Sequence, residues 1–287
     1  MTLSPIPFVE ELKRRNANTR EAWGPSAGHR AHVTHLLRDA AQEIAAPRRL
    51  CLLGAGNCND VSLDMLLAAY DELHLVDLDA DSLAAGIARQ APSEVKRIRS
   101  HGRMDVTGCL TQLAKEITPS SADSDQLGEW IERIKNLPSF PQPSPFHVVA
   151  SLALLTQIGE CALLLVGGPH HSRGNELLFA LRNHHLRKLL EMTRPGGDAF
   201  LITDVVSSFT FPNLPLLADA DLPTAMYQQV ALKNFFTGAN PYAIEALLKN
   251  DPIMQAKVKS VEMLPPWRWN QGNRNLLMSG LKIRVNS

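Results

Sequence analysis

A glycine-containing turn and an aspartate at the end of the next apolar run have the spacing of a ligand-binding site. The stretch "LCLLGAGNC" ends a short apolar run in Gly54-Ala55-Gly56, and Asp77 closes the next apolar run. Glycine lets the backbone pass close to a ligand. A carboxylate at the end of the second strand of such a unit can accept hydrogen bonds from both hydroxyls of a ribose. The pair therefore predicts a site for a ligand that contains a ribose.

The same turn lacks the third glycine of a dinucleotide site. That glycine stands at the sixth position of the fingerprint, where this chain has Asn59. In dinucleotide-binding proteins it lets the following helix pack closely while the pyrophosphate lies at the helix N-terminus. The substitution counts against an NAD(P)-dependent oxidoreductase.

Three polar residues are candidates for contact with an acceptor. Asp204 ends the predicted fifth strand, "DAFLITDVV", and "GGPHHSRGNE" places His170 and His171 in a polar loop. A carboxylate at the carboxyl end of a strand can bind a substrate amine or act as a base. A loop histidine can act in the same way or simply face solvent. We take Asp204 and His170 as candidate bases and His171 as a candidate substrate ligand.

Three histidines follow one another in "GHRAHVTHLL". His29, His32 and His35 stand at three-residue steps along a predicted helix, and no Cys or acidic partner lies nearby in the sequence. A zinc site needs such further ligands, so we predict no metal. His29 lies where this helix begins and remains a candidate base.

Aromatic residues near the C-terminus suggest a second wall of the site. In "PPWRWNQGNR", Trp267 and Trp269 flank Arg268 and share one face of a predicted strand. Two indoles on one face can cage a cation, or they can pack against the rest of the protein. We expect Trp267, together with Tyr242 from the preceding Pro-interrupted segment, to line an acceptor pocket.

Apolar runs alternate with stretches of helical periodicity from Arg49 onward. Five short runs predict strands, and the alternation indicates parallel βαβ units. The C-terminal segment "VKSVEMLPPWRWNQGNRNLLMSGLKIRV" predicts two more strands joined by a turn, which cannot be parallel to each other. We expect an N-terminal helical cap over residues 1–46, a main domain over 47–287, and a lid-like helical insertion at about 208–256.

Composition limits the classes of partner. The chain has 287 residues, of which 45% are apolar, and its 29 Lys and Arg balance 29 Asp and Glu. No global positive field exists to attract nucleic acid, so we do not expect a nucleic acid partner. Four cysteines without a CxxC pair suggest reduced thiols in the cytoplasm. No leader and no membrane partner is expected, and the oligomeric state stays open, with a homodimer as one option.

Five stretches together resemble the class I S-adenosylmethionine-dependent methyltransferases. The resemblance runs from about Arg49 to Val206, through "LCLLGAGNC", "LHLVDLD", "RMDVTG", "FHVVASLALLTQI" and "TRPGGDAFLITDVV". In that family a hairpin inserts the antiparallel seventh strand, in keeping with the C-terminal segment. The resemblance implies a doubly wound α/β fold with a mostly parallel seven-stranded sheet, an antiparallel C-terminal hairpin and N-terminal helices.

The resemblance also implies S-adenosylmethionine as the cofactor and assigns roles to residues. Asp77 would accept from the ribose hydroxyls, and Asp105 would accept from the adenine amino group. The other expected cofactor contacts come from the turn and from the strand ends: Gly54, Ala55, Gly56, Asn57, Leu78, Val106 and Ser151. Since N-terminal helices cover the cofactor in many small-molecule methyltransferases, Trp23, His29 and Arg30 are expected in the pocket.

The sequence does not assign a partner to the amino end of the cofactor's methionine part. Many family members carry an acidic residue two positions before the first motif glycine, where this chain has Leu52. Backbone carbonyls, or a residue of the N-terminal helices, would then hold the amino end of the cofactor's methionine part.

The expected activity is methyl transfer to a small-molecule acceptor through an N, O or S nucleophile. The "NPPY" and "DPPY" signatures of base and glutamine methylation are absent after the fourth strand. A protein or RNA methyltransferase is an alternative, as is a non-methylating protein of the same fold. Aminopropyl transferases place acidic residues near the fourth strand, where this chain has Ser151 and Thr156. An NAD(P) oxidoreductase ranks below all of these.

Overall fold

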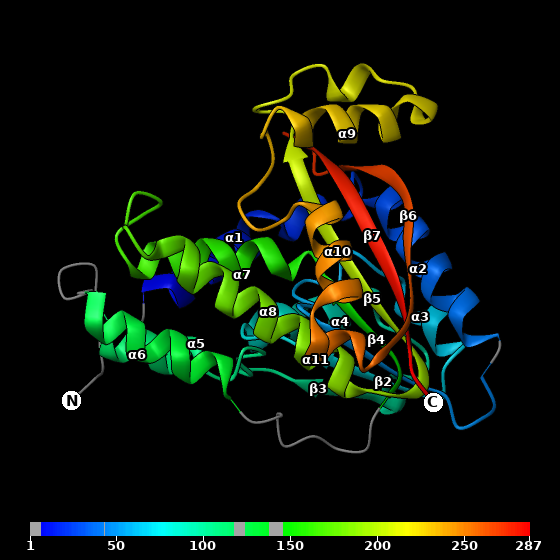
Figure 1. Ribbon diagram of the computed structural model, residues 1–287. Coiled ribbons are helices and arrows are strands. Elements are labelled where there is room, and N and C mark those ends of the chain that lie inside the picture. Colours follow the sequence, from blue (N-terminus) through cyan, green and yellow to red (C-terminus); the bar gives the residue numbers. More distant parts are fainter. Residues whose placement is uncertain (1–6, 43, 118–123, 138–145) are drawn as a thin grey trace.

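The computed structural model describes residues 7–42, 44–117, 124–137 and 146–287, and a single seven-stranded sheet forms its centre (Figure 1). The strand order is β3-β2-β1-β4-β5-β7-β6. The first five strands run parallel, and β7 lies antiparallel between β5 and β6. The strands are β1 (Arg49–Leu53), β2 (Glu72–Val76), β3 (Ile98–His101), β4 (Phe146–Leu152), β5 (Thr193–Ser207), β6 (Val258–Asn270) and β7 (Asn275–Val285). This order confirms the predicted mostly parallel sheet with an antiparallel C-terminal hairpin.

Helices cover both faces of the sheet, as the doubly wound prediction requires. One face carries α2, α3 and α4, and the other carries α8, α10 and α11. The α5, α6 and α7 helices form a neighbouring cluster with part of α8. The helices are α1 (Pro7–Asn18), α2 (Ala27–Ala41), α3 (Leu63–Leu67), α4 (Ala80–Gln90), α5 (Leu110–Glu116), α6 (Ser124–Lys135), α7 (Leu154–Leu165), α8 (Gly174–Met192), α9 (Leu222–Ala231), α10 (Pro241–Asn250) and α11 (Pro252–Gln255).

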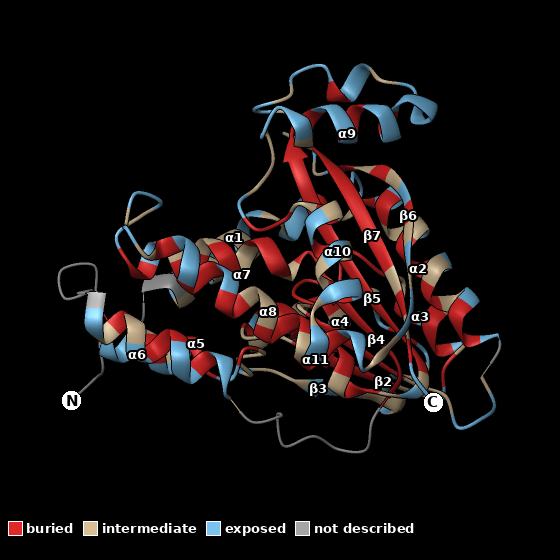
Figure 2. Ribbon diagram, in the orientation of Figure 1, coloured by how far each residue is buried: buried red, intermediate tan, exposed pale blue. Residues whose placement is uncertain are grey.

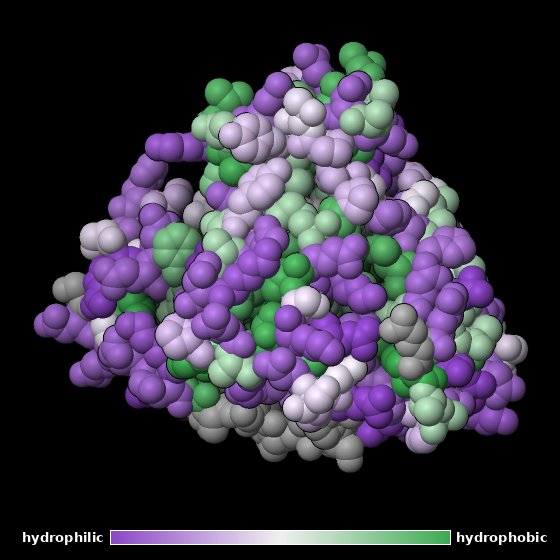
Figure 3. All heavy atoms as spheres, turned by 45° about the vertical axis from the view of Figure 1, so that its right-hand side comes forward, coloured by the Kyte–Doolittle hydropathy of each residue, from purple (hydrophilic) through white to green (hydrophobic). Residues whose placement is uncertain are grey.

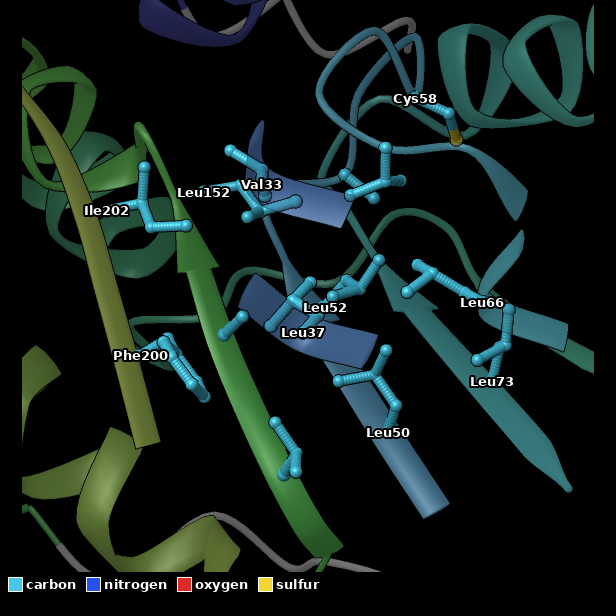
Figure 4. Close-up of a cluster of buried hydrophobic side chains, with 14 of the residues drawn as sticks. Val33, Leu37, Leu50, Leu52, Cys58, Leu66, Leu73, Leu152, Phe200 and Ile202 are labelled. Atoms are coloured by element: carbon cyan, nitrogen blue, oxygen red, sulfur yellow. The ribbon is translucent and has the colours of Figure 1, made fainter. Parts of the chain in front are cut away.

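The core is continuous from α2 across the central strands. Figure 4 shows Val33 and Leu37 of α2 beside Leu50 and Leu52 of β1, and all four side chains are fully buried. Every residue of β4 is buried, so both faces of this strand are covered by the helix layers (Figure 2). The carboxyl end of this strand, at Leu152, borders the candidate site.

The N-terminal segment does not form one separate cap. Val33 and Leu37 place α2 in the sheet-covering layer, because its apolar face packs on β1. The preceding α1 and the short 3-10 helix η1 (Arg20–Trp23) lie over the loop after β1, which α2 also contacts through His29. The predicted boundary at residue 46 therefore does not separate two structural units.

The segment 208–256 is likewise only partly a lid. Its first half, with α9, packs on the ends of β5 and β7 through Leu222 and Met226. Its second half, with α10 and α11, packs on the sheet face through Ile244, Leu248 and Met254. Ile244 and Leu248 are buried because α10 presents apolar residues to the sheet at helical spacing, and Met254 is buried from α11. The insertion thus contributes a cap and a layer helix.

The face of the molecule that Figure 3 draws carries mostly hydrophilic side chains, with hydrophobic ones between them. In Figure 3 hydrophobic side chains also gather at the α9 end of the molecule, where Leu216 and Leu232 are exposed. Across the described ranges, every helix is too short or too polar to cross a bilayer.

Candidate functional site

Two adjoining cavities open at the carboxyl ends of the parallel strands. A narrow slot lies between β2 and the segment after β3, and its lining includes Asp77, Leu78, Asp105 and Val106. A larger cavity of about 480 Å³ lies beside it, a size suited to small ligands. Gly54 and two polar residues, Asn16 and Gln157, line both cavities. One elongated ligand could therefore extend from the slot into the cavity.

The turn after β1 binds directly to the aspartate at the end of β2. The Gly56 N–H donates to Oδ2 of Asp77 over 2.7 Å, and the Asp79 N–H donates to Oδ1 over 2.8 Å. Gly54 has a φ of +76°, and a Cβ there would lie 3.1 Å from the backbone oxygen of Leu152. Glycine is therefore required at this first position, and the turn is pinned against the carboxylate.

Asp77 keeps acceptor capacity for a ligand. Each carboxylate oxygen can accept two hydrogen bonds, and each accepts one from the backbone amides of Gly56 and Asp79. Burial raises the pKa of Asp77 to about 6, although the backbone amides of Asp79, Gly56 and Leu78 act in the opposite direction. Ribose hydroxyls would donate to the remaining lone pairs and favour the ionised form.

The close packing behind this turn comes from a different residue than the fingerprint predicts. Gly86 lies in α4, and a Cβ there would lie 2.5 Å from the backbone carbon and oxygen of Asn57. The guanidinium of Arg89, also on α4, donates to the backbone oxygen of Asn57 and to Oδ1 of Asn59. Gly86 of α4 thus allows the close approach that the third glycine allows in a dinucleotide site. Asn59, which stands at the position of that glycine, binds the loop to Arg89 of α4.

Asp105 lines the slot but is already occupied by its own chain. Its Oδ1 accepts from the N–H and hydroxyl of Thr107, and its Oδ2 accepts from the N–H and hydroxyl of Thr111. These four bonds fill the carboxylate's acceptor positions. Asp105 therefore shapes the loop that leads into α5, which differs from the expected contact with an adenine amino group. Val106 and Leu78, the other two residues predicted at an adenine, lie in the slot wall.

The first helix closes the slot from outside. The amide of Asn16 donates to Asp79 over 3.1 Å, and the amide of Asn57 donates to the backbone oxygen of Asn16 over 2.6 Å. Arg15 forms an ion pair with Glu160 of α7. The α1 helix thus bridges the β1 loop and α7 across the cavity.

Asp204, a predicted candidate base, lies in the wall of the larger cavity. The residue is 8% exposed, and the Thr156 hydroxyl donates to its Oδ1 over 2.6 Å. Burial raises the pKa of Asp204 to about 6, against the opposite effect of the Thr156 hydrogen bond. No ion pair with a Lys or Arg of the described ranges neutralises it. Phe236 and Trp269 also line this cavity.

Ser151 does not reach either cavity. Its side chain is fully buried and lies 2.8 Å from Nε2 of His185 on α8. Alternate residues of a strand point to opposite faces, and this register turns Ser151 toward the helix layer. The predicted cofactor contact is corrected to a core hydrogen bond.

His29 and Trp267 are brought together, but inside the protein rather than at the cavity surface. The Trp267 indole donates to Nδ1 of His29 over 2.9 Å, and Trp269 stacks on the same imidazole with ring centroids 4.2 Å apart. The Trp269 indole donates to Ser26 over 2.9 Å. His29 is 1% exposed, so it cannot meet an acceptor directly, and the indoles form no open cage.

Trp23 and Arg30 lie behind the loop after β1. The Arg30 guanidinium lies 3.5 Å from the centre of a Trp23 ring, and Arg89 lies on that ring at 4.9 Å. Arg30 also donates to the backbone oxygen of Trp23. The two residues brace Arg89, which holds the loop, and neither lines the two cavities.

The remaining predicted acceptor residues also lie elsewhere. His170 is exposed and His171 half-buried in the loop between α7 and α8, and neither lines the two cavities. Tyr242 packs edge-to-face on Tyr227, with ring centroids 6.2 Å apart, in the cap formed with α9. In the part of the chain that the structure describes, no three His, Cys, Asp or Glu side chains group as metal ligands.

Several cavity residues are absent from the sequence-based set. They lie in α1, in the β1 loop, in α7 and in the β6–β7 turn: Asn16, Asp60, Thr156, Gln157 and Arg274. The polar run "NANT" at the end of the first helix is the one signal that could have indicated α1.

Solved structures that the chain is similar to include three methyltransferases. The N-methyltransferase NodS from Bradyrhizobium japonicum is 10% identical at a TM-score of 0.48, over 91% of this chain and 98% of NodS. An rRNA methylase from Streptococcus thermophilus is 10% identical at 0.43, over 89% and 97%. An amino pentose methyltransferase from Micromonospora echinaspora is 16% identical at 0.35, over 67% and 55%. No protein-family model matches the chain, and no curated protein matches it.

Proposed function

We propose that the chain is an S-adenosylmethionine-dependent methyltransferase that acts on a small-molecule acceptor. The observation that carries the proposal is the continuity of the two cavities around Gly54, with Asp77 at one end and Asp204 at the other. The slot has the composition that an adenosine group requires, since Asp77 can accept from a ribose while Leu78, Met104 and Val106 offer apolar walls. A cofactor with an adenosine end and a reactive end fits this arrangement.

S-adenosylmethionine supplies a methyl group on a sulfonium, which leaves as a neutral thioether. The protein then has to bind, orient and exclude water, because the leaving group needs no assistance. Asp77 and the turn at Gly56 would fix the adenosine end. The α1 helix would restrict access of water, since Asn16 and Arg15 bridge the β1 loop and α7.

Asp204 would orient the acceptor. Its pKa of about 6 leaves the carboxylate mostly ionised at neutral pH and able to accept a proton. The hydrogen bond from Thr156 fixes one oxygen, and the other oxygen would accept from the nucleophilic group. The size of the larger cavity and the balanced charge of the chain favour a small acceptor over a nucleic acid.

The test is a methyl-transfer assay with labelled S-adenosylmethionine against a library of small amines, thiols and phenols. We expect transfer to at least one acceptor class by the wild type. Asp204→Asn should lower turnover while leaving the affinity for S-adenosylhomocysteine unchanged. Equal losses of turnover and affinity would place Asp204 in the cofactor site. Transfer only to RNA or protein would refute the small-molecule acceptor.

A further inference from the structure

The loop after β1 ends in the carboxylate of Asp60, which contacts a buried histidine. Asp60 lines the larger cavity, and its side chain is 12% exposed. The one side chain of the described ranges that hydrogen-bonds it is His29, at 2.9 Å from Oδ1. No Lys or Arg of those ranges forms an ion pair with Asp60. The second carboxylate oxygen therefore remains available to a cation in the cavity.

The hydrogen-bond partners of His29 determine where its proton lies. An indole N–H is a donor only, and the Trp267 indole lies 2.9 Å from Nδ1 of His29. Nδ1 must therefore accept, which leaves the proton of the neutral ring on Nε2. Nε2 faces Oδ1 of Asp60, so the imidazole donates to the carboxylate. A chain of two hydrogen bonds thus runs from β6 through α2 to the cavity wall.

This chain is rigidly packed. His29 is 1% exposed and stacks on Trp269 at 4.2 Å with an interplanar angle of 10°. His32 of α2 lies 4.3 Å from the Trp267 ring. Side chains locked in this way hold a polar group at a fixed position without reorganisation. Buried residues that hydrogen-bond in this way can orient a carboxylate that binds a ligand.

We propose that Asp60 binds the ammonium group of the cofactor's amino-acid part, and that His29 and Trp267 are positioning residues that orient its carboxylate. The proposal rests on the proposed function. Asp60 follows the loop that begins at Gly54, and the same cavity wall includes Asn57 and Asn59 of that loop. The amino-acid end of a cofactor whose adenosine lies beside Asp77 would extend along this loop. The ammonium contact is then made by a side chain of the loop itself, a third possibility beside backbone carbonyls and the N-terminal helices.

The binding test compares two ligands that differ in the amino-acid part. S-adenosylhomocysteine carries the ammonium group, and 5′-methylthioadenosine lacks the entire amino-acid end. Calorimetry should show that Asp60→Asn weakens binding of S-adenosylhomocysteine by about 10-fold or more, the scale of a charged hydrogen bond. Binding of 5′-methylthioadenosine should change less than about twofold, because that ligand makes no contact with Asp60. Asp81→Asn removes the same charge from an exposed position on α4 and should leave both affinities unchanged.

Two further variants test the positioning role. His29→Gln keeps a donor for Asp60 and should retain most of the affinity, whereas His29→Leu should lose as much as Asp60→Asn. Trp267→Phe keeps an aromatic ring but removes the donor to Nδ1. In nitrogen-15 spectra of labelled histidine, the wild-type His29 signal should show a proton on Nε2 alone, and Trp267→Phe should show both tautomers.

The outcomes separate this proposal from the proposed function. Failure of the wild type to bind S-adenosylhomocysteine would refute the proposed function. Wild-type binding with unchanged affinity in Asp60→Asn would overturn only the present proposal, and that result is also expected if Asp60 binds an acceptor amine instead. A wild-type His29 with its proton on Nδ1 would overturn the positioning role.

Discussion

The hydroxyl of Thr156 donates to Oδ1 of Asp204 over 2.6 Å, and this bond joins the first turn of α7 to the end of β5. Asp204 is 8% exposed, and burial raises its pKa from 3.8 to about 6. Folding therefore disfavours the ionised form of this group. The contribution of the neutral carboxyl group to the free energy of unfolding is fully present below pH 4 and is lost as the pH rises through 6.

Asp204→Asn should accordingly stabilise the ligand-free protein at high pH. The gain is expected to reach at most about 3 kcal/mol at pH 8, and it should be small at pH 4, where both residues are neutral. The Asn Oδ1 can still accept from Thr156. Urea unfolding at the two pH values checks this, with Asp81→Asn as the exposed control. An equal effect of Asp204→Asn at both pH values would contradict the conclusion that burial raises the pKa of Asp204.

Gly86 should be intolerant of a methyl group. Alanine normally stabilises a helix interior by about 0.5–1 kcal/mol relative to glycine, but a Cβ at Gly86 would lie 2.5 Å from the Asn57 backbone. Gly86→Ala should therefore lower the melting temperature and weaken binding of S-adenosylhomocysteine, because the β1 loop must shift. Gly28→Ala is the matched control, since a Cβ at that helical glycine meets no atom within 4 Å. Stabilisation by both substitutions would contradict the close packing of α4 on the loop.

Asp105 should act on stability more than on cofactor recognition. Its two oxygens accept four hydrogen bonds from Thr107 and Thr111, so Asp105→Ala should cost about 2–3 kcal/mol of unfolding free energy. Asp105→Asn keeps one acceptor oxygen and should cost less. Amide hydrogen exchange in α5 should be faster in both variants than in the wild type. Exchange in α3 should keep its wild-type rate. Unchanged exchange in α5 would show that the carboxylate does not hold this loop.

The sheet and the ends of its strands could be predicted because they depend on local patterns. Short apolar runs closed by polar residues predict buried strands, and a carboxylate that ends such a run must lie at the carboxyl edge of the sheet. Asp77 and Asp204 lie there. The same reasoning predicted that β6 and β7 pair antiparallel, since a short turn joins them. Pro265 and Pro266 fit the position of β6 at the sheet edge.

The errors involve contacts between segments that are far apart in the sequence. His29 and Trp267 meet across 238 positions, and no periodicity of either segment reveals that contact. Ser151 lies in the predicted strand, but its face depends on the register against β5 and on the position of α8. The distinction between a lid and a layer helix in α10 also depends on where the helix packs. Such contacts are determined by the three-dimensional arrangement of the elements.

Cofactor binding should depend on pH through Asp77. Burial raises the pKa of this carboxyl group to about 6 in the ligand-free protein, and ribose hydroxyls favour the ionised form. Affinity for S-adenosylhomocysteine should therefore be constant above pH 7 and should fall as the pH drops through 6. Calorimetry from pH 5 to pH 8 checks the dependence, and Asp77→Asn should abolish it while lowering affinity by a few kcal/mol. A pH dependence retained in Asp77→Asn would assign the titration to another group.

The most direct test of the central claim is calorimetry of the purified protein with S-adenosylhomocysteine, with NAD as the control ligand. The slot at Asp77 and the loop at Gly54 predict binding in the micromolar range for S-adenosylhomocysteine and none for NAD, since the loop has no third glycine for a pyrophosphate. Binding of NAD alone would contradict the methyltransferase proposal and indicate a dinucleotide enzyme. Absence of binding for both ligands would contradict the assignment of the slot as a cofactor site.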